Sequence, residues 1–281
     1  MALRTLSPLK KAPAAFSAAF SGRVGLEIVG FSLNFKSDPP GIISIIKRRY
    51  GKFGSVGGSG FSFEVSEACG RQTPFKPAVL SDGSRLEIER GDFRACLDMK
   101  TRTGTLRAAE NEQCLDAFLR SLISFLLIRS GGFMLHSAGL VKNGKAYLFL
   151  GKSGAGKSTL SKLAASAGVE IISDEINLVR PAKGGFRVYG SPFWGEMRAD
   201  GRQGSCPLGG IYLLKKAKVN RISPVSGGEA LRLLLRCLVN FEKSPGTAER
   251  VIKNASRLLV KAKFFRLEFS KADSGCLSLI Q

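Results

Sequence analysis

Apolar and polar residues alternate along the first part of the chain. Alternation with a period of two is typical of strands that bury one face, because successive side chains point to opposite sides of a sheet. We therefore expect a strand-rich region over residues 25–112, with a hairpin turn at Asp82-Gly83. The segments that predict strands are GLEIVGFSLNF (25–35), FSFEVSE (61–67), RLEIERGD (85–92) and FRACLDMKTRTGTLRA (93–108).

Two other segments show helical spacing. The segment SDPPGIISIIKRRYGKF (37–53) predicts a short helix, which Asp38 would cap while Pro39 and Pro40 occupy its first turn. The segment NEQCLDAFLRSLISFLLIRSG (111–131) predicts a longer helix, because its apolar residues recur at intervals of three and four. These residues are Leu115, Phe118, Leu119, Leu122, Phe125 and Leu126.

A hairpin and a glycine-rich loop follow this helix. The segments FMLHSAGLV (133–141) and KAYLFL (145–150) predict two strands with a turn at Asn143-Gly144. The second strand runs directly into GKSGAGKS (151–158). This loop precedes a predicted helix over 157–168.

An apolar strand, VEIISDEINLVR (169–180), is expected after the helix. The order of strand, loop, helix and strand is typical of α/β nucleotide-binding units. We therefore expect an α/β protein with three parts. They are a flexible N-terminal extension (1–24), the strand-rich region (25–112) and a nucleotide-binding catalytic domain (113–281).

The glycine-rich loop carries the strongest chemical signal. Residues 151–158 match the pattern G-x-x-x-x-G-K-[ST], in which backbone N–H groups and a helix N-terminus receive phosphate oxygens. Lys157 is then expected at the outer phosphates and the hydroxyl of Ser158 on Mg²⁺. The alternative is a glycine-rich turn without a ligand. The candidate nucleotide-binding residues are Gly151, Lys152, Ser153, Gly154, Ala155, Gly156, Lys157, Ser158 and Thr159.

Two acids and one histidine are the candidate partners of this loop. Asp174 and Glu175 follow an apolar run, where carboxylates are costly to bury unless they meet cations. One carboxylate would hold Mg²⁺ and the other would touch the reacting hydroxyl or water. The alternative is a solvated pair in a surface turn. His136, the only histidine of the chain, is either a catalytic group or an ordinary core or surface residue.

Composition narrows the classes of partner and location. The net charge is +21, yet the basic residues are spread singly among apolar ones, which disfavours nucleic acid as a partner. No apolar run reaches the roughly 20 residues of a membrane span. The first 26 residues are basic and free of acids, as in a transit peptide, but a flexible extension is the preferred interpretation. Six scattered cysteines without a C-x-x-C pair suit a reducing cytoplasm and disfavour a zinc site.

The segments GGFMLHSAGLVKNGKAYLFLGKSGAGKSTLSKL and IISDEINLV resemble the C-terminal catalytic domain of the HPr kinase/phosphorylase family. The resemblance implies a P-loop kinase fold shared with ATP-dependent phosphoenolpyruvate carboxykinase. By this resemblance His136 lies beside the phosphates, Asp174 is the base for a substrate serine, and Glu175 is a metal ligand.

The segment FWGEMRADGRQG (193–204) departs from that family, which has a continuous Glu-x-Arg-Gly segment. Glu196 and Arg198 are present, but no glycine follows directly. This departure argues against the phosphorylase reaction and against HPr as the substrate. The segment either covers the core or positions phosphate through Arg187, Arg198 and Arg202.

The expected function is that of an ATP- and Mg²⁺-dependent kinase that phosphorylates a hydroxyl, such as a serine of a small protein or peptide. The expected catalytic residues are Asp174, His136 and Lys157, and the expected metal ligands are Ser158 and Glu175. A nucleotide-hydrolysing switch without a phosphoryl acceptor is the alternative, and a nucleic-acid-associated module is a third. The sequence leaves the oligomeric state open.

Overall fold

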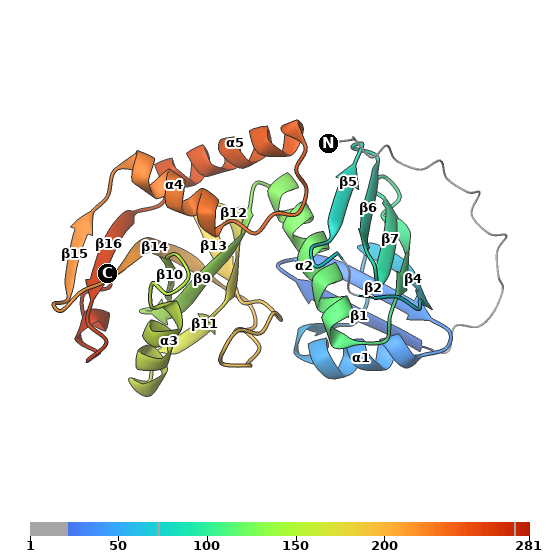
Figure 1. The fold of residues 1–281 in the computed structure, drawn as a ribbon, viewed down its shortest axis with the longest axis horizontal. Coiled ribbons are helices and arrows are strands. Elements are labelled where there is room, and N and C mark those ends of the chain that lie inside the picture. The colour runs from blue at the N-terminus through green and yellow to red at the C-terminus, as the bar shows by residue number, and fades with distance from the viewer. Residues whose placement is uncertain (1–21, 72–73, 273) are drawn as a thin grey trace. The chain divides into compact units, whose positions relative to one another are not determined.

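The computed structural model describes residues 22–71, 74–272 and 274–281 (Figure 1). It is a mixed α/β structure with two large sheets and, among these residues, five α-helices. The chain divides into two compact units, one formed by residues 22–26 and 32–118 and the other by residues 27–31 and 119–281. The predicted N-terminal extension lies outside the described residues up to position 21, whereas residues 22–24 belong to a strand.

The first unit is built on an eight-stranded sheet with the order β3-β1-β2-β4-β8-β7-β6-β5. Its strands are β1 (Gly22–Ile28), β2 (Phe31–Ser37), β3 (Gly54–Ser55), β4 (Phe61–Glu67), β5 (Ala78–Ser81), β6 (Arg85–Arg90), β7 (Phe93–Asp98) and β8 (Thr103–Ala108). Strands β2, β4 and β8 run parallel, and β5 to β8 pair antiparallel in sequence. The predicted turn at Asp82-Gly83 joins β5 to β6, and the carboxylate of Asp82 accepts the amide N–H groups of Ser84 and Arg85.

Helix α1 (Gly41–Tyr50) corrects one prediction from the sequence. It begins after Pro40, and no side chain caps it, so Asp38 is not its cap. The carbonyl of Pro40 instead accepts both the amide and the hydroxyl of Ser44. The fixed φ angle of proline favours this start. A short 3₁₀ helix, η1 (Gly51–Phe53), follows.

Helix α2 (Glu112–Arg129) supplies the central aromatic side chain of the first unit. Phe118 is fully buried and meets three phenylalanine rings edge to face. The ring centroids lie 5.5 Å from Phe63, 6.1 Å from Phe93 and 6.4 Å from Phe35. Such contacts add to the hydrophobic stabilisation of the core.

The replacement Phe118→Ala is expected to destabilise the protein by about 3–5 kcal/mol, because it opens a cavity among these rings. Urea denaturation followed by circular dichroism measures the loss. The control Phe75→Ala removes a ring that is 77% exposed and should stay within about 0.5 kcal/mol of the wild type. Equal effects of the two substitutions would contradict the described core.

The second unit contains the remaining strands. They are β9 (Phe133–Lys142), β10 (Lys145–Leu150), β11 (Glu170–Ser173), β12 (Ile176–Ala182), β13 (Gly185–Tyr189), β14 (Ser205–Lys216), β15 (Arg221–Pro224) and β16 (Phe264–Phe269). The path β10-β9-β12-β13-β14-β16-β15 closes on itself through a parallel pairing of β10 with β14. Strand β11 pairs with β9, so the neighbours β11, β9, β10, β14 and β16 lie side by side.

The hairpin predicted around Asn143-Gly144 is confirmed. Strands β9 and β10 pair antiparallel, and the two turn residues have φ angles of 51° and 71°. The prediction of a single strand over residues 169–180 is wrong, because the structure has two strands there, with Asp174 and Glu175 between them. The hydroxyl of Ser173 accepts the amides of Glu175 and Ile176 and thereby forms a turn.

Helices cover both faces of this sheet. Helix α3 (Lys157–Ser166) packs through Leu160 against Phe149 and Tyr212. On the opposite face, Leu234 of α4 (Gly227–Cys237) and Leu258 of α5 (Pro245–Lys261) join the core that contains Leu148. The adjacent residues 148 and 149 of β10 therefore point to different helices, as alternation in a strand requires. A second 3₁₀ helix, η2 (Gly275–Leu277), lies near the C-terminus.

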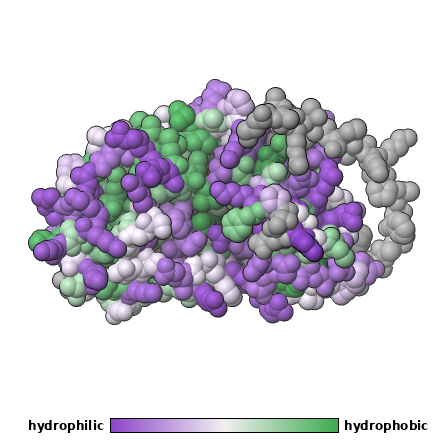
Figure 2. Space-filling model, viewed as in Figure 1, coloured by the Kyte–Doolittle hydropathy of each residue, from purple (hydrophilic) through white to green (hydrophobic). Residues whose placement is uncertain are grey.

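The surface in view is mainly hydrophilic, with apolar areas between the polar side chains (Figure 2). No helix within the described ranges combines the length and the apolar composition needed to cross a bilayer. All six cysteines are free thiols. Cys69 is exposed, whereas Cys114 is fully buried and burial, followed by the nearby charge of Asp92, raises its pKa to about 12.

Iodoacetamide at pH 8 should therefore modify Cys69 rapidly and leave Cys114 unmodified in the folded protein, because only the thiolate reacts. Peptide mass spectrometry measures the modified fraction at each position. Alkylation in concentrated guanidinium chloride is the control, in which all six cysteines should react. Equal reactivity of Cys69 and Cys114 in the folded protein would contradict the described burial.

Candidate active site

The glycine-rich loop lies where β10 ends and α3 begins. Gly154 and Gly156 have φ angles of 76° and 103°, in the region that favours glycine. A β-carbon at position 156 would also lie 2.6 Å from the ring of Phe269. The loop conformation therefore depends on glycine at this position, and it places the N-terminus of α3 directly after the loop.

Lys157 is held over the loop by neutral partners. Its side-chain nitrogen donates to the carbonyl oxygens of Gly151, at 3.0 Å, and Lys152, at 3.5 Å. The residue is only 7% exposed, and no carboxylate of the described chain forms an ion pair with it. A buried cation without a counter-charge is costly, so an anion above the loop would be stabilised there.

The two acids occupy the turn between β11 and β12. Asp174 is buried, and its Oδ2 accepts the backbone amide of Met197 at 2.9 Å. Glu175 is more exposed, and its Oε1 lies 3.9 Å from Nδ1 of His136. Burial, followed by the positive charge of Lys157, lowers the pKa of His136, and the carboxylate of Glu175 opposes this shift. His136 is therefore neutral at pH 7.

A buried polar cluster behind the acids positions the turn. Nδ2 of Asn177 donates to the carbonyl of Ser137 at 2.7 Å and to that of Ser173 at 3.3 Å. The amide of Ser137 donates to the carbonyl of Glu175 at 3.0 Å. This cluster was not predicted from the sequence. Its signal was three polar residues in otherwise apolar strands, since such groups are buried only with partners.

One pocket brings these segments together, and we call it the acid-side pocket. Its volume is about 270 Å³. The predicted residues that line it are His136, Ser153, Gly154, Gly156, Lys157, Ser158, Thr159, Asp174 and Glu175. Lys162, Glu196 and Lys216 complete the lining and were not predicted as site residues. Gly151, Lys152 and Ala155 line a neighbouring pocket on the other side of the loop.

The segment after β13 covers the two acids. Position 195 is a glycine whose β-carbon, if present, would lie 2.7 Å from both carboxylate oxygens of Asp174 and 2.6 Å from Cβ of Glu175. Glu196 follows, and its Oε2 lies 3.7 Å from the ammonium group of Lys162 on α3. The segment therefore covers the two acids, and Glu196 forms part of the wall of the acid-side pocket.

The three arginines that could position phosphate near this segment, Arg187, Arg198 and Arg202, do not line the acid-side pocket. Arg187 donates to Ser205, and Arg202 pairs with Glu170 at 2.8 Å. Arg198 is also absent from the lining, so the structure does not bring these three arginines to the acid-side pocket. Strand pairing explains this for Arg187, because β13 places it beside β14.

The donor set fits a magnesium ion bound together with phosphates. Within the described ranges, no group of three or more His, Cys, Asp or Glu side chains forms a metal site. The pocket does contain the hydroxyl of Ser158 and the carboxylate of Glu175. Mg²⁺ prefers such oxygen ligands and commonly takes only one or two from protein, with waters and substrate phosphates as the others.

The replacement Gly195→Ala is expected to destabilise the protein by about 1–3 kcal/mol, because the added methyl group must displace the acids or the covering segment. Chemical denaturation measures the change. The control Gly185→Ala adds the same group where no atom lies within 4 Å, so its effect should be small. A Gly195→Ala protein as stable as the control would contradict the close packing on Asp174.

In a comparison with protein-family models, residues 114–267 match the model of SynChlorMet cassette protein ScmC. No curated protein matches the sequence significantly. ScmC is a different family from the HPr kinase/phosphorylase family that the sequence motifs suggested. The assignment to the HPr kinase/phosphorylase family is therefore wrong. The resemblance rested on the loop and the acid pair, and phosphate binding imposes such local patterns on unrelated proteins. Because the match covers more than half of the chain, the chain belongs to the ScmC family.

Proposed function

We propose that this member of the ScmC family is an ATP- and Mg²⁺-dependent phosphotransferase that moves the γ-phosphoryl group to a hydroxyl. The supporting observation is the acid-side pocket, which combines Lys157 and Ser158 of the loop with Asp174, Glu175 and His136. These groups come from β9, α3 and the turn after β11. A phosphate loop, an acid pair and a neutral imidazole in one pocket are a set that supports phosphoryl transfer.

A P-loop kinase fold for the second unit is part of this proposal. Strand β10 leads into the loop and then into α3, as phosphate binding requires. Strands β10 and β11 both pair antiparallel with β9, so they run in the same direction with β9 between them. This arrangement brings the loop and the acids to one edge of the sheet.

Each group of the pocket has a defined role in the proposal. Backbone N–H groups of the loop and the ammonium group of Lys157 bind phosphate oxygens, and an anion there would offset the buried charge of Lys157. Ser158 and Glu175 would hold Mg²⁺, which would supply positive charge to the phosphates of ATP, the phosphoryl donor. Positioning and electrostatics account for most of the rate enhancement in such reactions.

Asp174 is proposed as the base that orients and deprotonates the acceptor hydroxyl. The amide of Met197 holds its Oδ2, which leaves Oδ1 as the oxygen for the acceptor. His136, neutral and beside Glu175, assists by hydrogen bonding. The acceptor we propose is a serine of a small protein or peptide. A cytoplasmic location belongs to the same proposal, since all six cysteines are free.

The replacement Lys157→Ala is expected to abolish ATP binding, because it removes the buried cation that faces the phosphates. Isothermal titration calorimetry with Mg²⁺ and ATP measures the affinity. The control Lys145→Ala removes an exposed lysine at the other end of β10 and should leave the affinity unchanged. Retained affinity in Lys157→Ala would refute the assignment of the phosphate site.

The replacement Asp174→Asn should retain ATP binding while phosphoryl transfer falls by about two to four orders of magnitude, because the base is lost. Incubation of the protein with [γ-³²P]ATP and an extract of the source cells measures transfer to an acceptor. A labelled acceptor supports the phosphotransferase, whereas free phosphate alone would identify a nucleotide-hydrolysing switch. Undiminished transfer by Asp174→Asn would remove this residue from the proposed role.

A further inference from the structure

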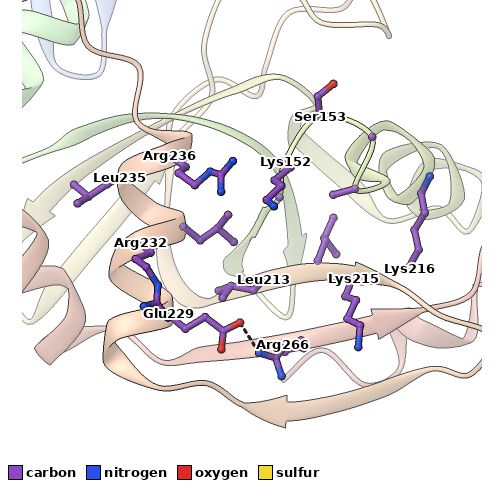
Figure 3. A pocket seen from close by; sticks show the side chains of 15 residues that line it. Lys152, Ser153, Leu213, Lys215, Lys216, Glu229, Arg232, Leu235, Arg236 and Arg266 are labelled. Carbon is purple, nitrogen blue, oxygen red and sulfur yellow. Dashed lines mark hydrogen bonds and ion pairs between the residues drawn. The ribbon is translucent and has the colours of Figure 1, made fainter.

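A second and larger pocket lies on the other side of the phosphate loop, and we call it the loop–helix pocket (Figure 3). Its volume is about 810 Å³, three times the 270 Å³ of the acid-side pocket. The loop, β14, α4 and β16 form its walls. Ser153, Gly154 and Lys216 line both pockets, so the two spaces adjoin across the loop.

The order of the strands assigns different parts of a bound triphosphate to the two pockets. Strands β11 and β9, with the acid pair and His136, flank β10 on one side. Strand β14, followed by β16, flanks it on the other, and these two strands run parallel to β10. A terminal phosphate beside Asp174 therefore directs the rest of the nucleotide across the loop toward β14. Ligands of parallel sheets bind at this end of the strands.

The lining of the loop–helix pocket combines an apolar surface with several cationic side chains. Its apolar side chains are Leu213, Leu214, Leu233 and Leu235. Glu229 and Arg266 form an ion pair across the base of the pocket, drawn as a dashed line in Figure 3. Among the described residues, no carboxylate pairs with Arg232 or Arg236, which stand one helical turn apart on α4.

The guanidinium group of Arg236 is placed for a planar ligand. Figure 3 shows Arg236 of α4 and Lys152 of the loop extending into the same space above Leu213. Arginine stacks on the faces of aromatic rings, and leucine side chains provide an apolar surface for the opposite face. Lys152 belongs to the loop and Lys216 lines both pockets, so these two cations flank the path that a phosphate chain on the loop would take. An aromatic base linked to an anionic chain matches this distribution.

We propose that the loop–helix pocket binds the nucleoside part of the nucleoside triphosphate, with the base between the leucine side chains and the guanidinium group of Arg236. This inference rests on the proposed function, because it requires phosphates on the loop. It makes the ligand a nucleotide and excludes an inorganic polyphosphate as the preferred donor. The alternative occupant of the loop–helix pocket is an anionic group of the phosphoryl acceptor. The following experiment distinguishes this alternative from a bound nucleoside.

The experiment compares the affinities for Mg²⁺-ATP and for Mg²⁺-tripolyphosphate, which lacks the nucleoside, by isothermal titration calorimetry. The wild type should bind ATP more tightly. The replacement Arg236→Ala should weaken ATP binding about tenfold and tripolyphosphate binding less than about twofold, because only ATP carries a base to stack. The control Arg257→Ala, an exposed arginine of α5 outside the pocket, should leave both affinities unchanged. GTP and CTP titrations then report the preferred base.

Three results would overturn the inference while leaving the phosphate site intact. Arg236→Ala could weaken the binding of ATP and of tripolyphosphate equally, which would show that Arg236 contacts the phosphates through its charge alone. It could leave ATP binding unchanged and reduce phosphoryl transfer, which would assign the pocket to the acceptor. The wild type could also bind the two ligands equally well. A wild type that binds neither ligand would instead refute the proposed function itself.

Discussion

The buried ammonium group of Lys157 is the constraint on which the rest of the site depends. Among the residues that the structure describes, it donates only to carbonyl oxygens of its own loop, so its charge is solvated by dipoles and remains available to an anion. Keeping it there requires the positive φ angles of Gly154 and Gly156 and the packing of Phe269 against the loop. The strand, the turn and the helix N-terminus are thus arranged around one positive charge.

The acids are placed by a separate set of constraints. The turn that carries Asp174 and Glu175 is held by the buried side chain of Asn177 and by two serine residues. The segment around Gly195 packs against this turn. The carboxylates therefore approach the loop without forming an ion pair with Lys157. This separation keeps the cation and the acids available for different partners, as the proposed phosphoryl transfer requires of a site that positions phosphate, metal and hydroxyl at once.

The glycine-rich loop also separates two pockets of different chemistry. The acid-side pocket is small and polar, whereas the loop–helix pocket is larger and is lined by leucines together with Arg232 and Arg236. The excess of positive charge that the composition shows is thus partly concentrated where a phosphate chain would run. Electrostatic attraction of anionic ligands toward this edge of the sheet follows from it.

The sequence alone determined the features that repeat over short distances: the hairpin at Asn143-Gly144, helix α2, and the loop between β10 and α3, because turn chemistry and hydrophobic period act locally. It did not determine the break between β11 and β12 or the start of α1, where hydrogen bonds of Ser173 and Pro40 decide. The family resemblance inferred from the loop and the acid pair was misleading, because short motifs do not identify the family to which a longer stretch of the chain belongs. Only the tertiary structure decided that Asp174 and Glu175 lie beside the loop and that Arg187 and Arg202 pair elsewhere. It also decided that α4 forms a second pocket beside the loop. The reason is that sheet pairing and packing bring together residues that are far apart in the chain.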